Sequence, residues 1–162
     1  MREQPFNSPV DVGLRLLTVL STCYPAAYSM DRLVAFDYFV VHTDDLPGGA
    51  PSLHPPTPYR SGEIVVRREL IQRGLRLLES RGLTNVVYKT DGIAFRASDR
   101  AGAFLDALGA PYTRSLRDAA SWVVQTYGES SIDSLQAQIA GGLDEWGAEF
   151  EMDAVLWSEG EA

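Results

Sequence analysis

The chain of 162 residues is poor in the side chains that carry most metal and nucleophile chemistry. It has one cysteine, Cys23, and two histidines, His42 and His54. One cysteine cannot form an internal disulfide, and these three residues lack the spacing of a zinc site. A glycine-rich phosphate loop and a Gly-x-Ser-x-Gly nucleophile elbow are missing as well. We therefore predict a protein with no metal, no cofactor and no enzymatic activity of its own.

Long apolar runs are also missing. The longest uncharged stretch, residues 16–30, has 15 residues and contains serines, threonines and a proline. A membrane-spanning helix needs about 20 mainly apolar residues. The N-terminal residues do not combine a basic stretch with a following apolar one, as a secretory signal does. Together with the single cysteine, these absences predict a cytoplasmic protein in a reducing compartment.

Basic residues are absent after Arg117. The whole chain has 14 basic and 22 acidic residues, a net charge of -8, and ten of the acids lie in the 45 positions after Arg117. The first 117 residues are therefore near +2. Because phosphate contacts supply most of the non-specific affinity for nucleic acid, this balance disfavours a tight, stand-alone nucleic-acid binder.

The apolar periodicity predicts a mainly helical chain with a small β-hairpin. Asp91-Gly92 is a strong hairpin signal between two strand-like runs, residues 86–88 and 93–95. Helix, helix, long helix and hairpin is the order of a winged helix-turn-helix, which we predict as the core over residues 8–97. C-terminal helices would form an extension over residues 98–162 of the same single domain, 1–162, ending in an acidic helix. The helices and the loop are predicted as follows: residues 8–24, 29–42, a proline-rich loop over 46–59, a long helix starting at Thr57 or Ser61 and ending near 81, then 99–108, 111–127 and about 131–157.

One face of the long helix is a candidate DNA contact. Arg68, Gln72 and Arg76 recur at steps of four, opposite the apolar stripe, where a recognition helix would face phosphates. Glu69 and Glu79 lie among these residues and weaken their field. A solvated face is therefore the alternative, and we rank it ahead of DNA contact.

Two charged residues fall on apolar stripes. Asp37 lies within the stripe of the second helix, and Arg67 lies within the stripe of the long helix. Burying either charge alone would cost several kcal/mol, so we predict a hydrogen-bonded Asp37–Arg67 pair that links the two helices. Separate partners or exposure at an interface are the alternatives. His42, beside Asp44 and Asp45, is expected to be a solvated helix cap rather than an acid-base or metal group.

Several segments together resemble the middle-component family of the ABC-three-component systems, over roughly residues 7–150. They are residues 7–9 (NSP), 37–42 (DYFVVH), 52–63 (SLHPPTPYRSGE), 66–70 (VRREL) and 73–75 (RGL). The resemblance implies a small, non-catalytic protein of bacterial anti-phage defence. It would act beside an SMC/RecF-like ABC ATPase and a separate effector, often a nuclease, as in Lamassu-like systems. The family assigns no catalytic residue that could be carried over.

Two classes of function therefore compete. As an adaptor subunit, the protein would present the proline-rich loop to a partner, or the loop would simply cover the chain's own core. The alternative is a winged-helix transcriptional regulator that reads operator DNA, and the neighbouring genes would separate the two. Aromatic residues ringed by acids near the C-terminus suit an interface with a second chain, either another copy or the ATPase. The candidate partner-binding residues are His54, Tyr59, Arg60 and Glu63 around the loop and Trp146, Phe150 and Trp157 near the C-terminus.

Overall fold

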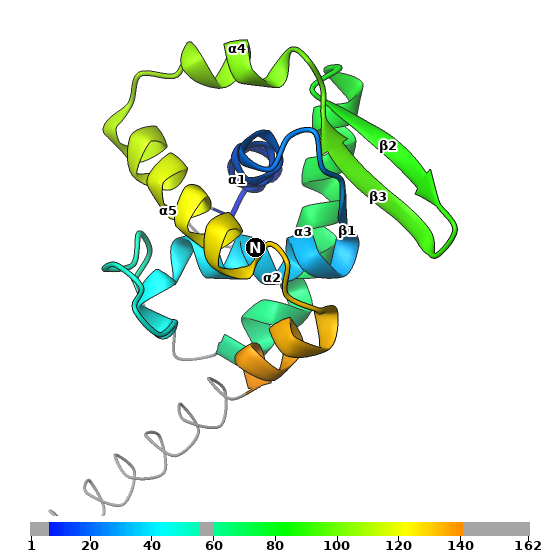
Figure 1. The fold of residues 1–162 in the computed structure, drawn as a ribbon. Helices are drawn as coiled ribbons and strands as arrows, with labels where there is room; N and C mark the ends of the chain where they lie inside the picture. The colour runs from blue at the N-terminus through cyan, green and yellow to red at the C-terminus, as the bar shows by residue number, and fades with distance from the viewer. Residues whose placement is uncertain (1–6, 56–59, 141–162) are drawn as a thin grey trace, which may run out of the picture.

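The computed structural model describes residues 7–55 and 60–140, with the side chains of the longest helix described from Arg67 onward. Helices dominate, and a small antiparallel sheet lies at one side of them (Figure 1). The mainly helical class is therefore confirmed. The elements are α1 (Pro9–Thr22), β1 (Tyr28–Ser29), α2 (Met30–Val41), the 3-10 turn η1 (Thr43–Asp45), α3 (Arg60–Ser80), β2 (Thr84–Lys89), β3 (Gly92–Ala97), α4 (Ala101–Asp106), α5 (Pro111–Tyr127) and a helix over residues 132–140.

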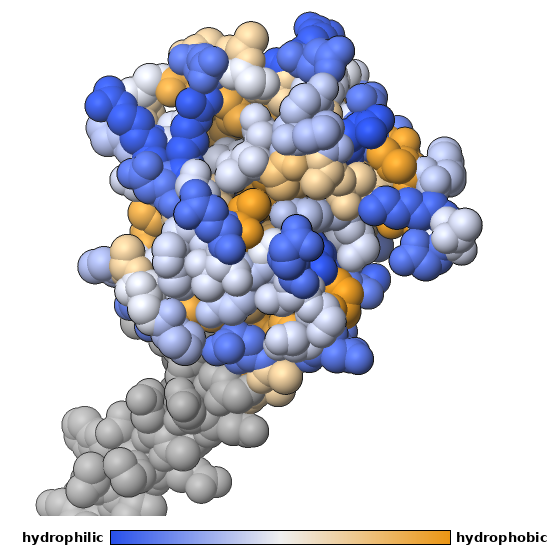
Figure 2. All heavy atoms as spheres, in the orientation of Figure 1, coloured by the Kyte–Doolittle hydropathy of each residue, from blue (hydrophilic) through white to orange (hydrophobic). Residues whose placement is uncertain are grey.

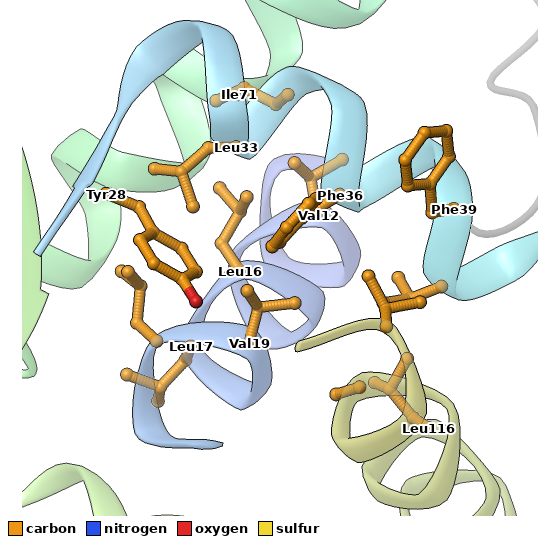
Figure 3. Close-up of a cluster of buried hydrophobic side chains, with 14 of the residues drawn as sticks. Val12, Leu16, Leu17, Val19, Tyr28, Leu33, Phe36, Phe39, Ile71 and Leu116 are labelled. Atoms are coloured by element: carbon orange, nitrogen blue, oxygen red, sulfur yellow. The ribbon is translucent and has the colours of Figure 1, made fainter. Parts of the chain in front are cut away.

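Helix α1 is the centre of the fold, with α3 and α5 on either side of it (Figure 1). A capping box starts it: the Ser8 hydroxyl accepts from the Asp11 amide at 3.2 Å, and the Asp11 carboxylate accepts from the Ser8 amide. Its apolar residues surround the helix axis, so it is buried on several sides at once. Figure 3 shows the resulting core, in which side chains of α1 meet those of α2, α3 and α5. The labelled core residues are Val12, Leu16, Leu17, Val19, Tyr28, Leu33, Phe36, Phe39, Ile71 and Leu116.

Two glycines mark a close approach of α1 and α3. A Cβ built on Gly74 would lie 3.1 Å from the backbone nitrogen of Gly13. A Cβ on Gly13 would meet its nearest atoms at 3.6 Å, which is ordinary contact. Glycine is therefore required by packing on the α3 side of this contact and only tolerated on the α1 side.

The sheet has three strands in the order β1–β3–β2, all antiparallel. The predicted hairpin is present, with Val86 opposite Phe95 and Gly92 in a positive-φ conformation in the turn. The sequence analysis did not predict β1, which pairs Tyr28 with Phe95. A strand of two residues is too short to show an alternating pattern.

The last described elements close the core. Helix α5 has the predicted bounds, and α4 is shorter than the predicted helix over residues 99–108. Arg32, in the first turn of α2, donates to the backbone oxygens of Tyr127 and Gly128, and so ties the end of α5 to α2. Leu135 is buried in the following helix, whose predicted continuation past residue 140 lies outside the described residues. Among the described helices, none is both long and apolar enough to cross a bilayer. On the face drawn in Figure 2, apolar residues occur in small groups among polar ones.

Candidate functional site

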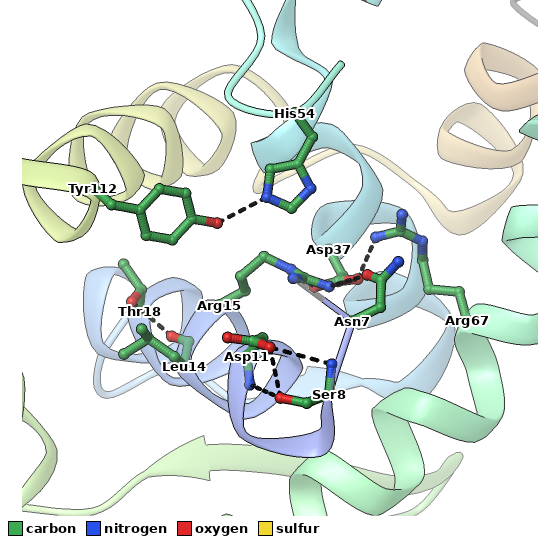
Figure 4. Close-up of polar contacts among 10 residues, drawn as sticks. All are labelled: Asn7, Ser8, Asp11, Leu14, Arg15, Thr18, Asp37, His54, Arg67 and Tyr112. Atoms are coloured by element: carbon green, nitrogen blue, oxygen red, sulfur yellow. Dashed lines mark hydrogen bonds and ion pairs between the residues drawn. The ribbon is translucent and has the colours of Figure 1, made fainter. Parts of the chain in front are cut away.

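A buried charge cluster joins the first three helices. Asp37, on α2, is completely buried and accepts hydrogen bonds from Arg15 of α1, at 2.7 Å to Nε and 3.2 Å to Nη2. Arg67, on α3, is 3% exposed and donates to the same carboxylate. Figure 4 shows the two arginines reaching Asp37 from opposite sides. Burial opposes ionisation of Asp37, but the two guanidinium groups outweigh it and lower the pKa of the carboxyl below its ordinary value.

The structure thus brings Asp37 and Arg67 together, as their helical positions predicted. The second arginine, Arg15, was missed by the sequence analysis. It stands in α1 between Leu14 and Leu16, and a single charge in a run of apolar residues was the available signal. Arg15 and Arg67 thus share the carboxylate of Asp37, and the fields of both arginines reach His54, which packs nearby.

His54 lies next to this cluster, near the end of the described part of the proline-rich loop. Its Nε2 shares a hydrogen bond of 2.9 Å with the hydroxyl of Tyr112 on α5 (Figure 4). Its backbone amide donates to the Val41 oxygen. Burial, followed by the positive field of Arg15, lowers the pKa of His54 to about 4. The ring is therefore neutral near pH 7, and it holds this part of the loop against the chain's own core.

The loop is also held at its start. The Thr43 hydroxyl donates to the Ala50 oxygen at 2.7 Å, and Ser52 is hydrogen-bonded to Asp44. These contacts and those of His54 fix residues 43–54 along the end of α2. The described part of the loop is thus held in one conformation against the end of α2.

The expectation that His42 would be a solvated cap was wrong. His42 is 2% exposed, and its ring lies 4.7 Å from the Tyr38 ring and 6.3 Å from that of His54, measured between centroids. The loop folds back over the end of α2 and covers it, which a local helix-end pattern cannot reveal. Tyr38 in turn donates to Asp45 at 2.7 Å. Within the described ranges, no group of three or more His, Cys, Asp or Glu is arranged to hold a metal ion.

The candidate DNA-contact residues lie on the opposite face of α3. Arg68, Gln72 and Arg76 are all exposed. Arg68 forms an ion pair of 2.7 Å with Asp31 of α2, and both side chains are about half exposed. In the part of the chain that the structure describes, no carboxylate lies within ion-pair distance of Arg76.

The remaining candidate residues cannot be placed. Tyr59 and the three C-terminal aromatic residues, Trp146, Phe150 and Trp157, lie outside the described residues. Arg60 and Glu63 belong to the first turns of α3, where only the backbone is described. Of the loop residues predicted to bind a partner, the structure therefore places His54 alone. Tyr112, which contacts it, was not found from the sequence, because a tyrosine on an amphipathic helix gives no special signal.

Comparison with known proteins gives one match. The family model described as "ABC-three component (ABC-3C) system Middle Component 2" matches residues 5–149. No curated protein and no solved structure is significantly similar to the chain.

Proposed function

The chain belongs to the Middle Component 2 family of ABC-three-component systems, and from this premise we propose that it is the non-catalytic adaptor subunit of a bacterial anti-phage defence complex. It would link an SMC/RecF-like ABC ATPase to an effector such as a nuclease, in the cytoplasm. The observation that carries the proposal is the family match, which spans nearly the whole chain. Membership in a multi-component system implies partner components, and we propose that these are the ATPase and the effector.

The buried charged side chains give the protein a fixed shape, which supports an adaptor function. Arg15 and Arg67 both bind Asp37 in the interior, and His54 binds Tyr112. These contacts hold three helices and the loop in fixed positions. A rigid surface suits a protein that must present the same shape to a partner, because little conformational entropy is then lost on binding.

We assign two contact regions to the partners. The first is the proline-rich loop over residues 46–59 together with Arg60 and Glu63, where prolines restrict the free chain. The second is the C-terminal segment with Trp146, Phe150 and Trp157, whose apolar rings stand among acids. Aromatic side chains of this kind are typical anchors of protein interfaces.

Co-purification with the products of the neighbouring genes tests the adaptor function. A stable complex with an ABC-type ATPase is expected, with ATP hydrolysis absent from the isolated chain. The triple variant W146A/F150A/W157A should lose the complex, whereas the matched variant Tyr88→Ala, which removes an exposed hairpin aromatic, should keep it. A chain that assembles with none of its neighbours would contradict the proposal.

A winged-helix DNA-binding regulator is the second candidate. The order α1, β1, α2, α3, β2, β3 and the sheet order β1–β3–β2 support a winged-helix core. The segment over residues 42–59 departs from the 3–4-residue turn of a standard helix-turn-helix. The exposed Arg68, Gln72 and Arg76 favour this candidate, since the helix that carries them precedes the hairpin. Sequence-specific binding to the chain's own promoter, lost in Arg76→Ala, would establish it.

A further inference from the structure

The exposed face of α3 carries a row of arginines that face solvent. Arg68 and Arg73 are more than half exposed; among the described residues, Arg68 pairs with the exposed Asp31 and Arg73 with the exposed Glu69. Gln72 and Arg76 continue the row. Exposed ion pairs of this type are weak and exchange readily with other partners. We call Arg68, Gln72, Arg73 and Arg76 the arginine row.

The chain around residues 127–130 is tied to the same end of α2 as this row. Asp31, which pairs with Arg68, is followed in α2 by Arg32, which donates to the backbone oxygens of Gly128 and Ser130. The turn that starts the last described helix is therefore held beside the same end of α2 that contacts α3. Figure 1 shows that helix, over residues 132–140, at the end of the molecule where α3 begins.

The sequence beyond residue 140 is complementary in charge to the row. Residues 141–162 contain seven acidic and no basic residues. Glu145, Glu149 and Asp153 recur at steps of four, the same spacing as Arg68, Gln72 and Arg76. Side chains four apart lie on one face of a helix, so two such rows can run side by side.

The connection is long enough to reach. An extended chain covers up to about 3.5 Å per residue, so the stretch from residue 140 to 144 can span about 14 Å before the segment begins. The arginine row spans residues 68–76, which is eight steps of about 1.5 Å on a helix, or about 12 Å. A tethered segment also has a high effective concentration at a site within its reach, which favours the same chain over a second copy.

We propose that the acidic C-terminal segment, residues 144–153, binds along the arginine row of α3 in the same chain. The hairpin tip is a poorer site for this segment, because Tyr88 and Ile93 are exposed there beside one lysine and one aspartate, Lys89 and Asp91. This contact uses the acids Glu145, Glu149 and Asp153 and leaves the aromatic residues Trp146, Phe150 and Trp157 for a partner, so it does not depend on the adaptor function.

Paramagnetic relaxation measured by NMR on the full chain tests this contact. In a Cys23→Ser background, a nitroxide is attached to Ala148→Cys, within the acidic segment. Loss of intensity is expected at the backbone amides of residues 68–76 and not at those of β2 and β3. The broadening should weaken in about 0.5 M salt, where the Debye length falls to a few ångström.

Charge reversal supplies the matched control. Arg76→Glu should remove the broadening of α3, whereas Arg114→Glu, the same change at an exposed site on α5, should leave it intact. An equimolar mixture of spin-labelled chain with isotope-labelled chain that lacks the nitroxide should show no broadening. Broadening in the mixture would assign the contact to a second copy and overturn the proposal. Absence of broadening at α3, or its persistence in Arg76→Glu, would also overturn it.

Discussion

Arg67 and Arg68 are consecutive residues on α3, and each binds an aspartate of α2, yet they belong to different environments. Arg67 is buried and shares the buried Asp37 with Arg15. Arg68 is half exposed, as is its partner Asp31. The same pair of functional groups thus occurs once in the interior and once in water. From this comparison we expect burial, and not the identity of the pair, to determine what a broken contact costs.

The two faces of α3 differ in the same way along their length. The buried face continues through Ile71 and Gly74, which pack against α1 so closely that a larger side chain at Gly74 would force the helices to shift. The exposed face continues through Gln72 and Arg76, where contacts can be exchanged. A helix can therefore serve as part of the core on one side and as a binding surface on the other.

The largest effect is expected from Asp37→Asn. Removing this charge leaves two buried arginines without their carboxylate, and breaking a buried ion pair costs about 3–5 kcal/mol. Urea unfolding should show a loss of that size in the free energy of unfolding. The matched change Asp31→Asn, at the exposed pair, should cost less than about 1 kcal/mol. Equal losses at the two positions would remove the distinction between the faces.

A smaller loss is expected from Gly74→Ala, on the buried face. The added Cβ would meet the Gly13 backbone at 3.1 Å, so α1 and α3 must shift, at a cost of about 1–3 kcal/mol. Gly13→Ala, across the same contact, meets its neighbours at 3.6 Å and should instead stabilise by up to about 1 kcal/mol, because alanine favours the helix. Thermal unfolding of both variants measures the difference. Destabilisation by Gly13→Ala as large as that by Gly74→Ala would contradict the packing argument.

The pH dependence of stability tests the loop above the buried cluster. The pKa of His54 is about 4 in the folded chain, below the ordinary 6.5, so the unfolded chain binds more protons between these values. The free energy of unfolding should therefore fall as the pH is lowered from 7 toward 4. Because His54 is half-buried, we expect its share to be about 1 kcal/mol.

His54→Gln isolates that share, since the longer amide reaches the position of Nε2 and can replace the hydrogen bond to Tyr112 without titrating. Urea unfolding at pH 7 and at pH 4.5 should show a smaller difference in the variant than in the parent chain. If the parent chain and the variant lose the same stability on acidification, His54 is solvated and the loop is not held against the cluster of Asp37, Arg15 and Arg67.

The smallest effect is expected from Arg68→Ala. Its exposed pair with Asp31 contributes about 0–1 kcal/mol, so the melting temperature should be almost unchanged. In contrast, Arg67→Ala, one residue earlier, should destabilise the chain strongly because Asp37 would lose a buried partner. A large loss in Arg68→Ala would show that the exposed face is also part of the folded core.

The helices could be predicted from local patterns because each pattern reports on its own segment. Helix α1 begins after Ser8, α2 is capped by Ser29, and α5 begins at Pro111, all as predicted. The pair Asp37–Arg67 was predictable as well, since each residue interrupts an apolar stripe at a helical spacing. Strand β1 was not, because two residues carry no periodicity and it forms only by pairing with β3.

The sequence by itself therefore determined the helical class, the hairpin, the acidic end and the existence of a buried charge that needs a partner. Tertiary structure alone decided that Asp37 has two arginines, that the loop covers His42, and that His54 meets Tyr112, 58 positions along the chain. The physical reason is that capping and periodicity act between residues a few positions apart. Burial and charge pairing depend on which distant segments the fold brings together.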